Sequence, residues 1–458
     1  MALKAPVDRV HLLGIGGSGC SGLARLLHGS GVAVSGSDER DGERLQALRD
    51  LGIDVIAGPQ QLADLDGGWV VRSAAVADSD PLLLEARRRE VPCLLYSEFV
   101  GKLSQGVRTL AIAGTHGKTS TTALTVSALR AAGFDPSYLV GGDVPDLEGN
   151  GHCGASDLFV VEACEFNRSF HQIRPNLAAI LNLEHDHFDC YPSREELEES
   201  FALYARNLKP GGSLLVHEQV GSRVLSLLPS NISIITIGQG LYCDLRALDV
   251  EQEAGRYSFT PCWDQERLPR IDLKLRGDFQ ATNALFALAL AILAGADPGR
   301  AAQGLASFRG VERRFSIHYS SSGREIVDDY AHHPGEIRAV LSTVRQVFPG
   351  RRVLCAFQPH QHSRTLNLLA EFGQALSLAD EGLVADIYAA REDPLADHGI
   401  DAEDLAAEIR RAGGQARAAG RVEKLGAEVL SAAGPATIPV ILGAGDLDAV
   451  VDEVVRGL

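Results

Sequence analysis

The chain has 458 residues and a formal net charge of −17, with 45% hydrophobic and 22% charged residues. At roughly 150 residues per domain, this length predicts about three domains, each with its own core, and excludes a single small module or a disordered chain. The acidic balance argues against broad nucleic-acid binding, which needs a positive face. We therefore expect a globular protein without a nucleic-acid partner, in which local cationic groups would have to hold any anionic substrate.

Membrane insertion and export are not expected. The longest run of small and apolar residues, at 284–296, is shorter than the roughly 20 residues that span a bilayer, and it predicts a buried core helix. No signal-type apolar segment follows the N-terminus. The eight cysteines contain no C-x-x-C pair, so neither a zinc site nor a disulfide scaffold is indicated. We expect a cytoplasmic protein, either a monomer or a homodimer.

Short apolar strands alternate with helices from the N-terminus onward, which predicts an α/β fold of βαβ units with mainly parallel sheets. The first unit has a strand at 10–13, a helix at 21–28 and a second strand at 32–35. A strand at 109–113 then enters a new glycine-rich turn, and a helix follows at 120–132. This second turn predicts a separate nucleotide-binding domain.

Further strands are predicted at 158–161, 177–183, 352–357, 382–387 and 439–442. The segment 310–315 separates the central series from the last one. We expect a Rossmann-like N-terminal domain, a central P-loop ATPase-like domain with a parallel sheet and a Rossmann-like C-terminal domain, at residues 1–106, 107–311 and 312–458. The stretch 250–270 gives no clear pattern.

The first glycine-rich turn follows the strand at 10–13 and has a pyrophosphate-binding pattern. Its candidate binding residues are Gly14, Gly16, Gly17, Ser18 and Gly19, with Asp38 nineteen residues further on. Glycines allow close backbone approach, so a pyrophosphate can lie at the N-terminus of the following helix. The simplest interpretation is a dinucleotide site, and the alternative is a tight turn that binds nothing.

The second turn resembles a P-loop but has Ile112 where the usual pattern has its first glycine. Its residues are Gly114, Thr115, His116, Gly117, Lys118, Thr119 and Ser120. Backbone N–H groups can cradle phosphates there, Lys118 can reach the terminal ones, and a hydroxyl can bind Mg²⁺. A chance Gly-Lys-Thr sequence is less consistent with the strand before the turn and the helix after it.

Acidic and histidine side chains follow two predicted strands of the central domain. Glu162 ends the strand at 158–161, and Asp186 and His187 come just after the strand at 177–183. Carboxylate and imidazole groups at neighbouring strand ends can bind a divalent ion. From the pattern alone, an ordinary solvated glutamate and a hydrogen-bonded histidine are equally acceptable interpretations.

Two histidine-rich motifs follow short strands of the third domain. The motif at 328–334 contains His332, and the motif at 357–364 contains His360 and Arg364. Core packing does not explain such histidines well, although surface histidines that cap helices remain an alternative. The guanidinium of Arg364 suits a carboxylate or phosphate because it can donate two parallel hydrogen bonds.

Taken together, these motifs resemble the Mur ligase family of peptidoglycan synthesis. Six of them occur in the family's order along essentially the whole chain, at residues 14–19 with 35–38, 114–119, 162–165, 328–334, 386–392 and 443–446. An ordered set is far more specific than a lone glycine pattern. The resemblance implies that the first glycine turn holds the diphosphate of a UDP-sugar and that no redox cofactor is involved.

The resemblance also implies individual roles. Metal binding falls to Thr119, Glu162 and His187, and the adenine side of ATP to Asn283. The implied ATP-binding residues are Gly114, Thr115, His116, Gly117, Lys118, Thr119, Ser120, Asn283 and Arg314. The candidate catalytic residues are Lys118, Glu162, His187, His332, His360 and Arg364. His332, His360 or a phosphate oxygen could accept the proton of the attacking amine, and the sequence does not choose among them. Three positions depart from the family: Phe279-Gln280 replaces a common His-Asn, Gln361 replaces a common Arg, and Ala202 stands where many members carry a modified lysine.

The implied reaction is ATP-driven amide formation. The lactyl carboxylate of UDP-N-acetylmuramate attacks the γ-phosphate of ATP to give an acyl phosphate and ADP, and the amine of L-alanine then displaces phosphate. Three alternatives are kept: a family member that attaches a preformed tripeptide to the same UDP-sugar, an NAD-dependent oxidoreductase, and a non-catalytic nucleotide sensor. The oxidoreductase would leave Lys118, Glu162 and the third domain unexplained, and the sensor would release no ADP.

Overall fold

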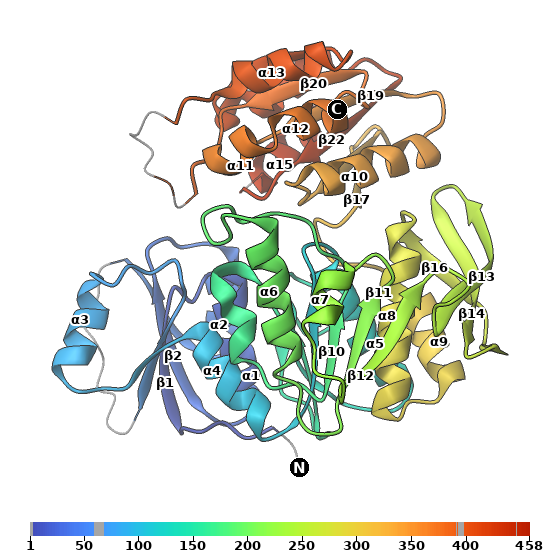
Figure 1. The fold of residues 1–458 in the computed structure, drawn as a ribbon. Helices are drawn as coiled ribbons and strands as arrows, with labels where there is room; N and C mark the ends of the chain where they lie inside the picture. Colours follow the sequence, from blue (N-terminus) through green and yellow to red (C-terminus); the bar gives the residue numbers. More distant parts are fainter. Residues whose placement is uncertain (1–2, 59–67, 391, 393–397, 446) are drawn as a thin grey trace.

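The computed structural model describes residues 3–58, 68–390, 392, 398–445 and 447–458. These residues form three sheets with helices packed on them, which confirms the expected α/β fold with three units. Figure 1 shows the third unit lying across the other two, which stand side by side. Arg391 and Asp446, each part of a motif noted above, lie outside the described residues. Within the described residues, no helix is long and apolar enough to cross a membrane.

The first sheet has five parallel strands in the order β3-β2-β1-β4-β5. They are β1 (Arg9–Leu13), β2 (Ala33–Asp38), β3 (Asp54–Ala57), β4 (Trp69–Arg72) and β5 (Cys93–Leu95). The helices of this unit are α1 (Ser18–Gly29), α2 (Glu43–Asp50), α3 (Pro81–Arg88) and α4 (Tyr96–Gln105). The chain order reverses between β1 and β4, where a parallel sheet opens a ligand crevice, and the first glycine turn follows β1 at that point.

The second sheet has eleven strands, and its middle is parallel in the order β12-β11-β10-β6-β9-β7. These strands are β6 (Arg108–Ala113), β7 (Ser137–Leu139), β9 (Leu158–Glu162), β10 (Leu177–Ile180), β11 (Ser213–His217) and β12 (Ser233–Gly238). The second glycine-rich turn follows β6, which lies between β9 and β10. The turn therefore lies at another switch point of a parallel sheet.

The expectation of a parallel central sheet is incomplete, because an antiparallel group extends one edge. It consists of β13 (Leu245–Glu253), β14 (Arg256–Trp263), β15 (Glu266–Arg267) and β16 (Ile271–Arg276). The other edge ends in β8 (Gly151–His152), antiparallel to β7. The helices of the unit are α5 (Lys118–Ala131), η1 (Phe166–Gln172), α6 (Arg194–Ala205), α7 (Ser222–Ser226), α8 (Phe279–Ala294) and α9 (Pro298–Ser307). Most residues of α8 are buried, which confirms the predicted core helix.

The third sheet has six strands in the order β17-β18-β22-β19-β20-β21, parallel except for the β17–β18 pair. They are β17 (Ser316–Tyr319), β18 (Glu325–Asp329), β19 (Arg352–Phe357), β20 (Glu381–Ala385), β21 (Ala416–Gly420) and β22 (Thr437–Leu442). Its helices are α10 (Pro334–Val347), α11 (His362–Asn367), α12 (Leu369–Leu376), α13 (Ala402–Arg411), η2 (Val422–Lys424), α14 (Leu425–Ala432) and α15 (Asp448–Gly457). Strand β22 is buried at all six positions, as expected for a parallel strand covered on both faces.

The buried apolar residues group differently at the two junctions between the units. One continuous cluster contains residues of both the first and the central sheet, such as Leu12 and Phe159. The buried clusters around the third sheet contain only residues from Phe315 onward. Among the described residues, the third unit therefore shares no buried apolar cluster with the rest.

Candidate active site

The first glycine turn is held by the end of β2. The N–H groups of Gly14 and Ile15 donate to the carbonyl oxygen of Ser37 at 2.8 and 3.1 Å, and the N–H of Gly16 donates to Asp38 Oδ2 at 2.9 Å. Position 14 favours glycine because its φ of +74° lies in the left-handed region. The Asp38 carboxylate is thus engaged with the turn itself.

Helix α1 begins directly after this turn, with Gly17 as its N-cap and no side chain capping it. Ser18 and Gly19 form the first residues of the helix, and Asn150 of the central unit donates to the carbonyl oxygen of Ser18 at 2.7 Å. The amide dipoles of a helix favour an anion at its N-terminus. The predicted turn residues therefore come together at the N-terminus of α1, and their binding of a diphosphate stays a prediction.

The phosphate loop between β6 and α5 has a similar construction. Gly114 and Gly117 have φ values of +141° and +80°, which favour glycine. Asn182, just after β10, accepts a hydrogen bond from the N–H of His116 at 2.8 Å and donates one to its carbonyl oxygen at 3.0 Å. Thr115 Oγ1 is similarly bonded to the backbone of Glu184. The loop is therefore fixed along the segment that follows β10.

Asn283, predicted for the adenine side of ATP, lies against this loop from helix α8. A Cβ atom at Gly117 would come within 2.8 Å of Asn283 Oδ1. The Asn283 side chain is buried and donates to Gln280 Oε1 at 3.2 Å. Gln280, one of the departures from the family pattern, thus orients the asparagine that faces the phosphate loop.

Lys118 is held as a cation at the start of α5. Its Nζ donates to the carbonyl oxygens of Gly114 and Thr115 at 2.6 and 3.0 Å and lies 2.9 Å from Glu165 Oε2. Burial disfavours both charged forms, but their mutual attraction outweighs it. The pKa of Lys118 is consequently raised and the pKa of Glu165 is lowered from their usual values. Lys118 therefore stays protonated at neutral pH.

The predicted metal residues divide into two neighbouring groups. Thr119 Oγ1 donates to Glu162 Oε2 at 2.9 Å, and the N–H of Gly141 donates to the same oxygen. Oxygen donors of this kind are what Mg²⁺ prefers, so the pair fits a magnesium ion bound beside the phosphates. His187 Nε2 instead lies 3.6 Å from Glu165 Oε1, and its buried Nδ1 has no hydrogen-bond partner among the described residues.

Arg364 of the third unit makes a buried ion pair with the central unit. Its Nε and Nη2 donate to the two carboxylate oxygens of Asp186 at 2.7 and 3.1 Å, and Nη1 donates to the carbonyl oxygen of His360 at 3.0 Å. Burial opposes the charge on Asp186, but Arg364 outweighs it and holds the pKa of Asp186 well below its usual value. The guanidinium predicted to bind a substrate carboxylate thus binds a protein carboxylate here.

His332 lies beside this pair, with its ring centroid 6.0 Å from that of His360. Burial lowers the pKa of His332 to about 4, although the Glu336 carboxylate acts in the opposite direction. Its Nδ1 is 3.0 Å from the carbonyl oxygen of Tyr330, so Nδ1 carries the proton in the neutral ring. At neutral pH, His332 is therefore a neutral imidazole that can accept a proton.

His116 connects the phosphate loop to the third unit. Its Nε2 is 3.3 Å from Glu184 Oε2, and its Nδ1 is 3.2 Å from Glu336 Oε1 in α10. Burial would lower the pKa of His116, but the two carboxylates outweigh it and raise the pKa to about 9. Arg314 Nη1 is 3.7 Å from the same Glu336 oxygen. Arg314 therefore lies at this junction, and its predicted contact with ATP stays a prediction.

Three acidic residues shape the site and were not predicted as site residues: Glu165, Glu184 and Glu336. Asp186 was expected to help bind a divalent ion and instead pairs with Arg364, and Glu165 stood inside the motif at 162–165. Glu184 and Glu336 have their partners on other strands or in another unit, so spacing along the chain carries no signal for them. The contact of Glu336 with His116 forms only when the third unit packs against the phosphate loop, whereas the contact of Glu184 with His116 forms between neighbouring strand ends of the central sheet.

Comparisons with known proteins agree with this architecture. Three profiles match in order: the Mur ligase family catalytic domain at residues 9–108, the Mur ligase middle domain at 112–291 and the Mur ligase glutamate ligase domain at 313–445. The UDP-N-acetylmuramate–L-alanine ligase of Mycolicibacterium vanbaalenii is 39% identical, over 97% of this chain and 95% of that protein.

Solved structures give the same result. The UDP-N-acetylmuramate–alanine ligase of Thermotoga maritima superposes with a TM-score of 0.80 at 28% identity, over 98% of each chain. The murein peptide ligase of Psychrobacter arcticus shares the fold, with a TM-score of 0.72 at 20% identity over 98% of each chain. Full-length identity near 40%, with three matching profiles in the same order, leads to one conclusion: this chain belongs to the Mur ligase family.

Proposed function

We propose that this protein is an ATP-dependent ligase that joins L-alanine to the lactyl carboxylate of UDP-N-acetylmuramate through an acyl phosphate. One structural observation carries the proposal: the loop that contains Lys118 lies against the third unit, which contributes His332, His360 and Arg364. A phosphate-binding loop and a carboxylate-binding arginine therefore meet at one junction. Relatives named for this activity align with nearly the whole chain, which supports the choice of substrates.

Each of the two glycine turns binds a different nucleotide. The turn at Gly14–Gly19 binds the diphosphate of the UDP-sugar, and the loop at Gly114–Ser120 binds the phosphates of ATP. Thr119 and Glu162 hold Mg²⁺, which when bound neutralises charge on the phosphates. Lys118, kept protonated by Glu165, stabilises charge on the transferring phosphoryl group, an effect that is often worth several kcal/mol.

The third unit positions the amino acid. Arg364 holds the carboxylate of L-alanine once the guanidinium is released from Asp186, because both carboxylates need the same donors. The amine must be neutral to attack, yet an α-amino group has a pKa of roughly 7.7–8.0. We assign His332 to take the proton that the nitrogen releases as it attacks the acyl phosphate, when that nitrogen is far more acidic than the free ammonium. Phosphate then leaves as the amide forms.

The tripeptide ligase remains the second candidate, since it shares the nucleotide chemistry and the fold. One assay separates the two: purified protein with ATP, Mg²⁺ and UDP-N-acetylmuramate receives L-alanine, glycine, L-serine or the tripeptide in turn, and phosphate release and product mass are measured. Phosphate release and an amide product with L-alanine alone are expected. Product with the tripeptide alone would support the second candidate. Binding of ATP without any ADP release would support a sensor.

We place the reaction in the cytoplasm, where ATP is available.

A further inference from the structure

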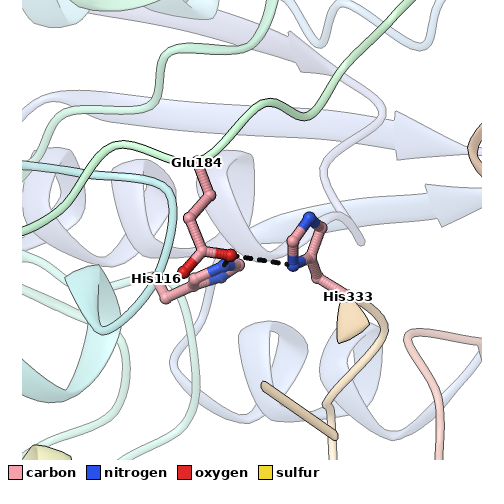
Figure 2. A group of neighbouring side chains, drawn as sticks. All are labelled: His116, Glu184 and His333. Carbon is pink, nitrogen blue, oxygen red and sulfur yellow. Dashed lines mark hydrogen bonds and ion pairs between the residues drawn. The ribbon is translucent and has the colours of Figure 1, made fainter. Parts of the chain in front are cut away.

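Three side chains from separate parts of the sequence converge beside the phosphate loop (Figure 2). His116 belongs to the loop, Glu184 follows β10, and His333 is the N-cap residue of α10 in the third unit. We propose that His116, Glu184 and His333 bind one divalent transition-metal ion, such as Zn²⁺, across the junction between the central and third units. The proposed function gives His116 a place in the ATP-binding loop but assigns no metal ion to this cluster.

The distances suit a shared ion. Glu184 Oε2 lies 3.3 Å from His116 Nε2 and 3.4 Å from His333 Nδ1, and all three atoms lie within 4.8 Å of one another. Ligands that bind Zn²⁺ tetrahedrally at about 2.0–2.1 Å are roughly 3.3–3.4 Å apart. A direct charge-assisted hydrogen bond would be shorter, at about 2.7–2.9 Å. The two measured distances therefore match the edges of a tetrahedral site, and the one between His116 and Glu184 is at the same time a long hydrogen bond that the ion would replace.

The donor set selects the class of metal. Two imidazole nitrogens and one carboxylate oxygen suit Zn²⁺, Co²⁺ or Ni²⁺, whereas Mg²⁺ and Ca²⁺ prefer oxygen ligands only. The oxygen pair of Thr119 and Glu162 is therefore chemically distinct from this cluster. Three protein ligands also leave a fourth position open for water.

The surroundings of the cluster orient its ligands. Glu336 Oε1 lies 3.2 Å from His116 Nδ1 and accepts its proton, and because the ring is protonated at neutral pH, an ion that binds Nε2 must displace the proton on that nitrogen. The side chain of His333 is 6% exposed, whereas that of Glu184 is 47% exposed, so an ion can enter from the Glu184 side. The N–H of Gly335 donates to His333 Nδ1 at 3.2 Å, and the ion would have to displace this hydrogen bond.

A second histidine-carboxylate group in the third unit is a competing site and supplies a control. It consists of His362, Glu392 and His398. The oxygens of Glu392 already accept hydrogen bonds from the N–H groups of His362 and Ser363 at 2.6 and 2.9 Å. Its carboxylate is therefore less available to a metal than that of Glu184, which accepts no backbone N–H at its side chain among the described hydrogen bonds.

Titration of the full-length protein with Co²⁺ in excess Mg²⁺ tests the site, because tetrahedral Co²⁺ with nitrogen ligands absorbs strongly in the visible range. We expect one tightly bound equivalent with this absorption. Glu184→Gln and His333→Asn should each weaken binding at least about 10-fold, and Glu336→Gln by about 10–100-fold. Asn at 333 remains a good N-cap, so α10 is preserved.

Two control variants keep the outcome unambiguous. His28→Asn changes an exposed histidine of α1 and should leave the titration unchanged. Loss of the absorption in His362→Asn, with normal binding in Glu184→Gln and His333→Asn, would place the ion in the competing group and overturn the proposal. A pale spectrum without a tight equivalent would overturn it as well.

An ion bound here would tie the phosphate loop to the third unit, so it should inhibit turnover. This consequence rests on the proposed function. Micromolar Zn²⁺ in excess Mg²⁺ should lower the rate of phosphate release in the wild-type protein but much less in His333→Asn, each relative to its own metal-free rate. Inhibition that is equal in both proteins would contradict this consequence. A wild-type protein that binds Co²⁺ but makes no amide would contradict the proposed function alone.

Discussion

The two junctions between the three units differ in the kind of side chain that forms them. The first and central units share one buried apolar cluster, and a Cβ atom at Gly151 would lie only 1.9 Å from the carbonyl oxygen of Gly22. The central and third units meet through charged pairs, including the buried pair of Arg364 and Asp186. An apolar junction loses its burial when it opens, whereas charged groups gain hydration. The comparison indicates a rigid first junction and a second junction that can open.

The largest effect is expected at the polar junction, from Lys118→Ala. Removal of a cation that stabilises the transferring phosphoryl group should lower kcat at least about 10³-fold. The fold should persist at a lower free energy of unfolding, by about 3 kcal/mol, because the buried Glu165 carboxylate loses its ion-pair partner. Phosphate release and the thermal unfolding profile test both statements, and normal ADP formation would defeat the assignment of Lys118.

Phe170→Ala, in the apolar cluster shared by the first and central units, should lower stability instead of acting directly on catalysis. Phe170 is fully buried in that cluster and stacks on Tyr204 with a centroid distance of 5.0 Å. Its removal should lower the free energy of unfolding of the first and central units together by about 3–5 kcal/mol. Phe372→Ala, in the core of the third unit, is the matched control. Calorimetry should show separate transitions shifted by the two variants; one transition shifted equally by both would contradict the comparison.

Asp186→Asn should open the polar junction. A buried Arg364 without its carboxylate costs the docked arrangement about 3 kcal/mol, unless the third unit moves away and water reaches the guanidinium. We expect a larger radius of gyration by small-angle scattering and faster proteolysis near residues 310–315. Arg44→Gln is the control, since its ion pair with Asp143 is partly exposed and worth about 1 kcal/mol or less. Unchanged scattering in Asp186→Asn would show that the pair does not hold the units together.

The smallest effect is expected from pH. Glu336 of the docked third unit and Glu184 of the central unit together raise the pKa of His116 from 6.5 to about 9, so the part contributed by Glu336 stabilises docking while His116 is protonated and is lost as pH rises through 9. At about 1.4 kcal/mol per pKa unit, the docked arrangement should lose on the order of 2 kcal/mol over this range. The radius of gyration measured against pH should show this change. Glu336→Gln should reduce it, and an equally steep profile in that variant would exclude His116 as the cause.

Much of the fold could be predicted from local pattern. The strands at 10–13, 109–113, 352–357 and 439–442 were found because uninterrupted apolar runs are typical of buried parallel strands. The antiparallel group β13–β16 could not, since exposed residues such as Glu251 and Glu253 obscure its alternation and its register is set by cross-strand pairing. The local pattern of apolar residues therefore predicts which strands are buried, but it does not predict which strands pair with one another.

The candidate site divides in the same way. Lys118, Thr119 and Glu162 are close to one another as the motifs suggested, because a glycine loop and two adjacent strand ends determine their positions. The pairing of Arg364 with Asp186 and of His116 with Glu336 joins residues more than 170 positions apart. Such contacts depend on how the third unit docks, and no spacing in the chain encodes them.

The absence of a shared apolar cluster at the second junction, among the described residues, has a consequence for how such enzymes diversify. A graft made in the segment 310–315 would exchange the third unit, which we propose selects the amino acid, without exposing a shared apolar cluster on either fragment. Acceptor choice can then evolve by replacement of this module while both nucleotide sites stay intact. A cut between the first and central units would instead expose the buried apolar cluster that the two units share.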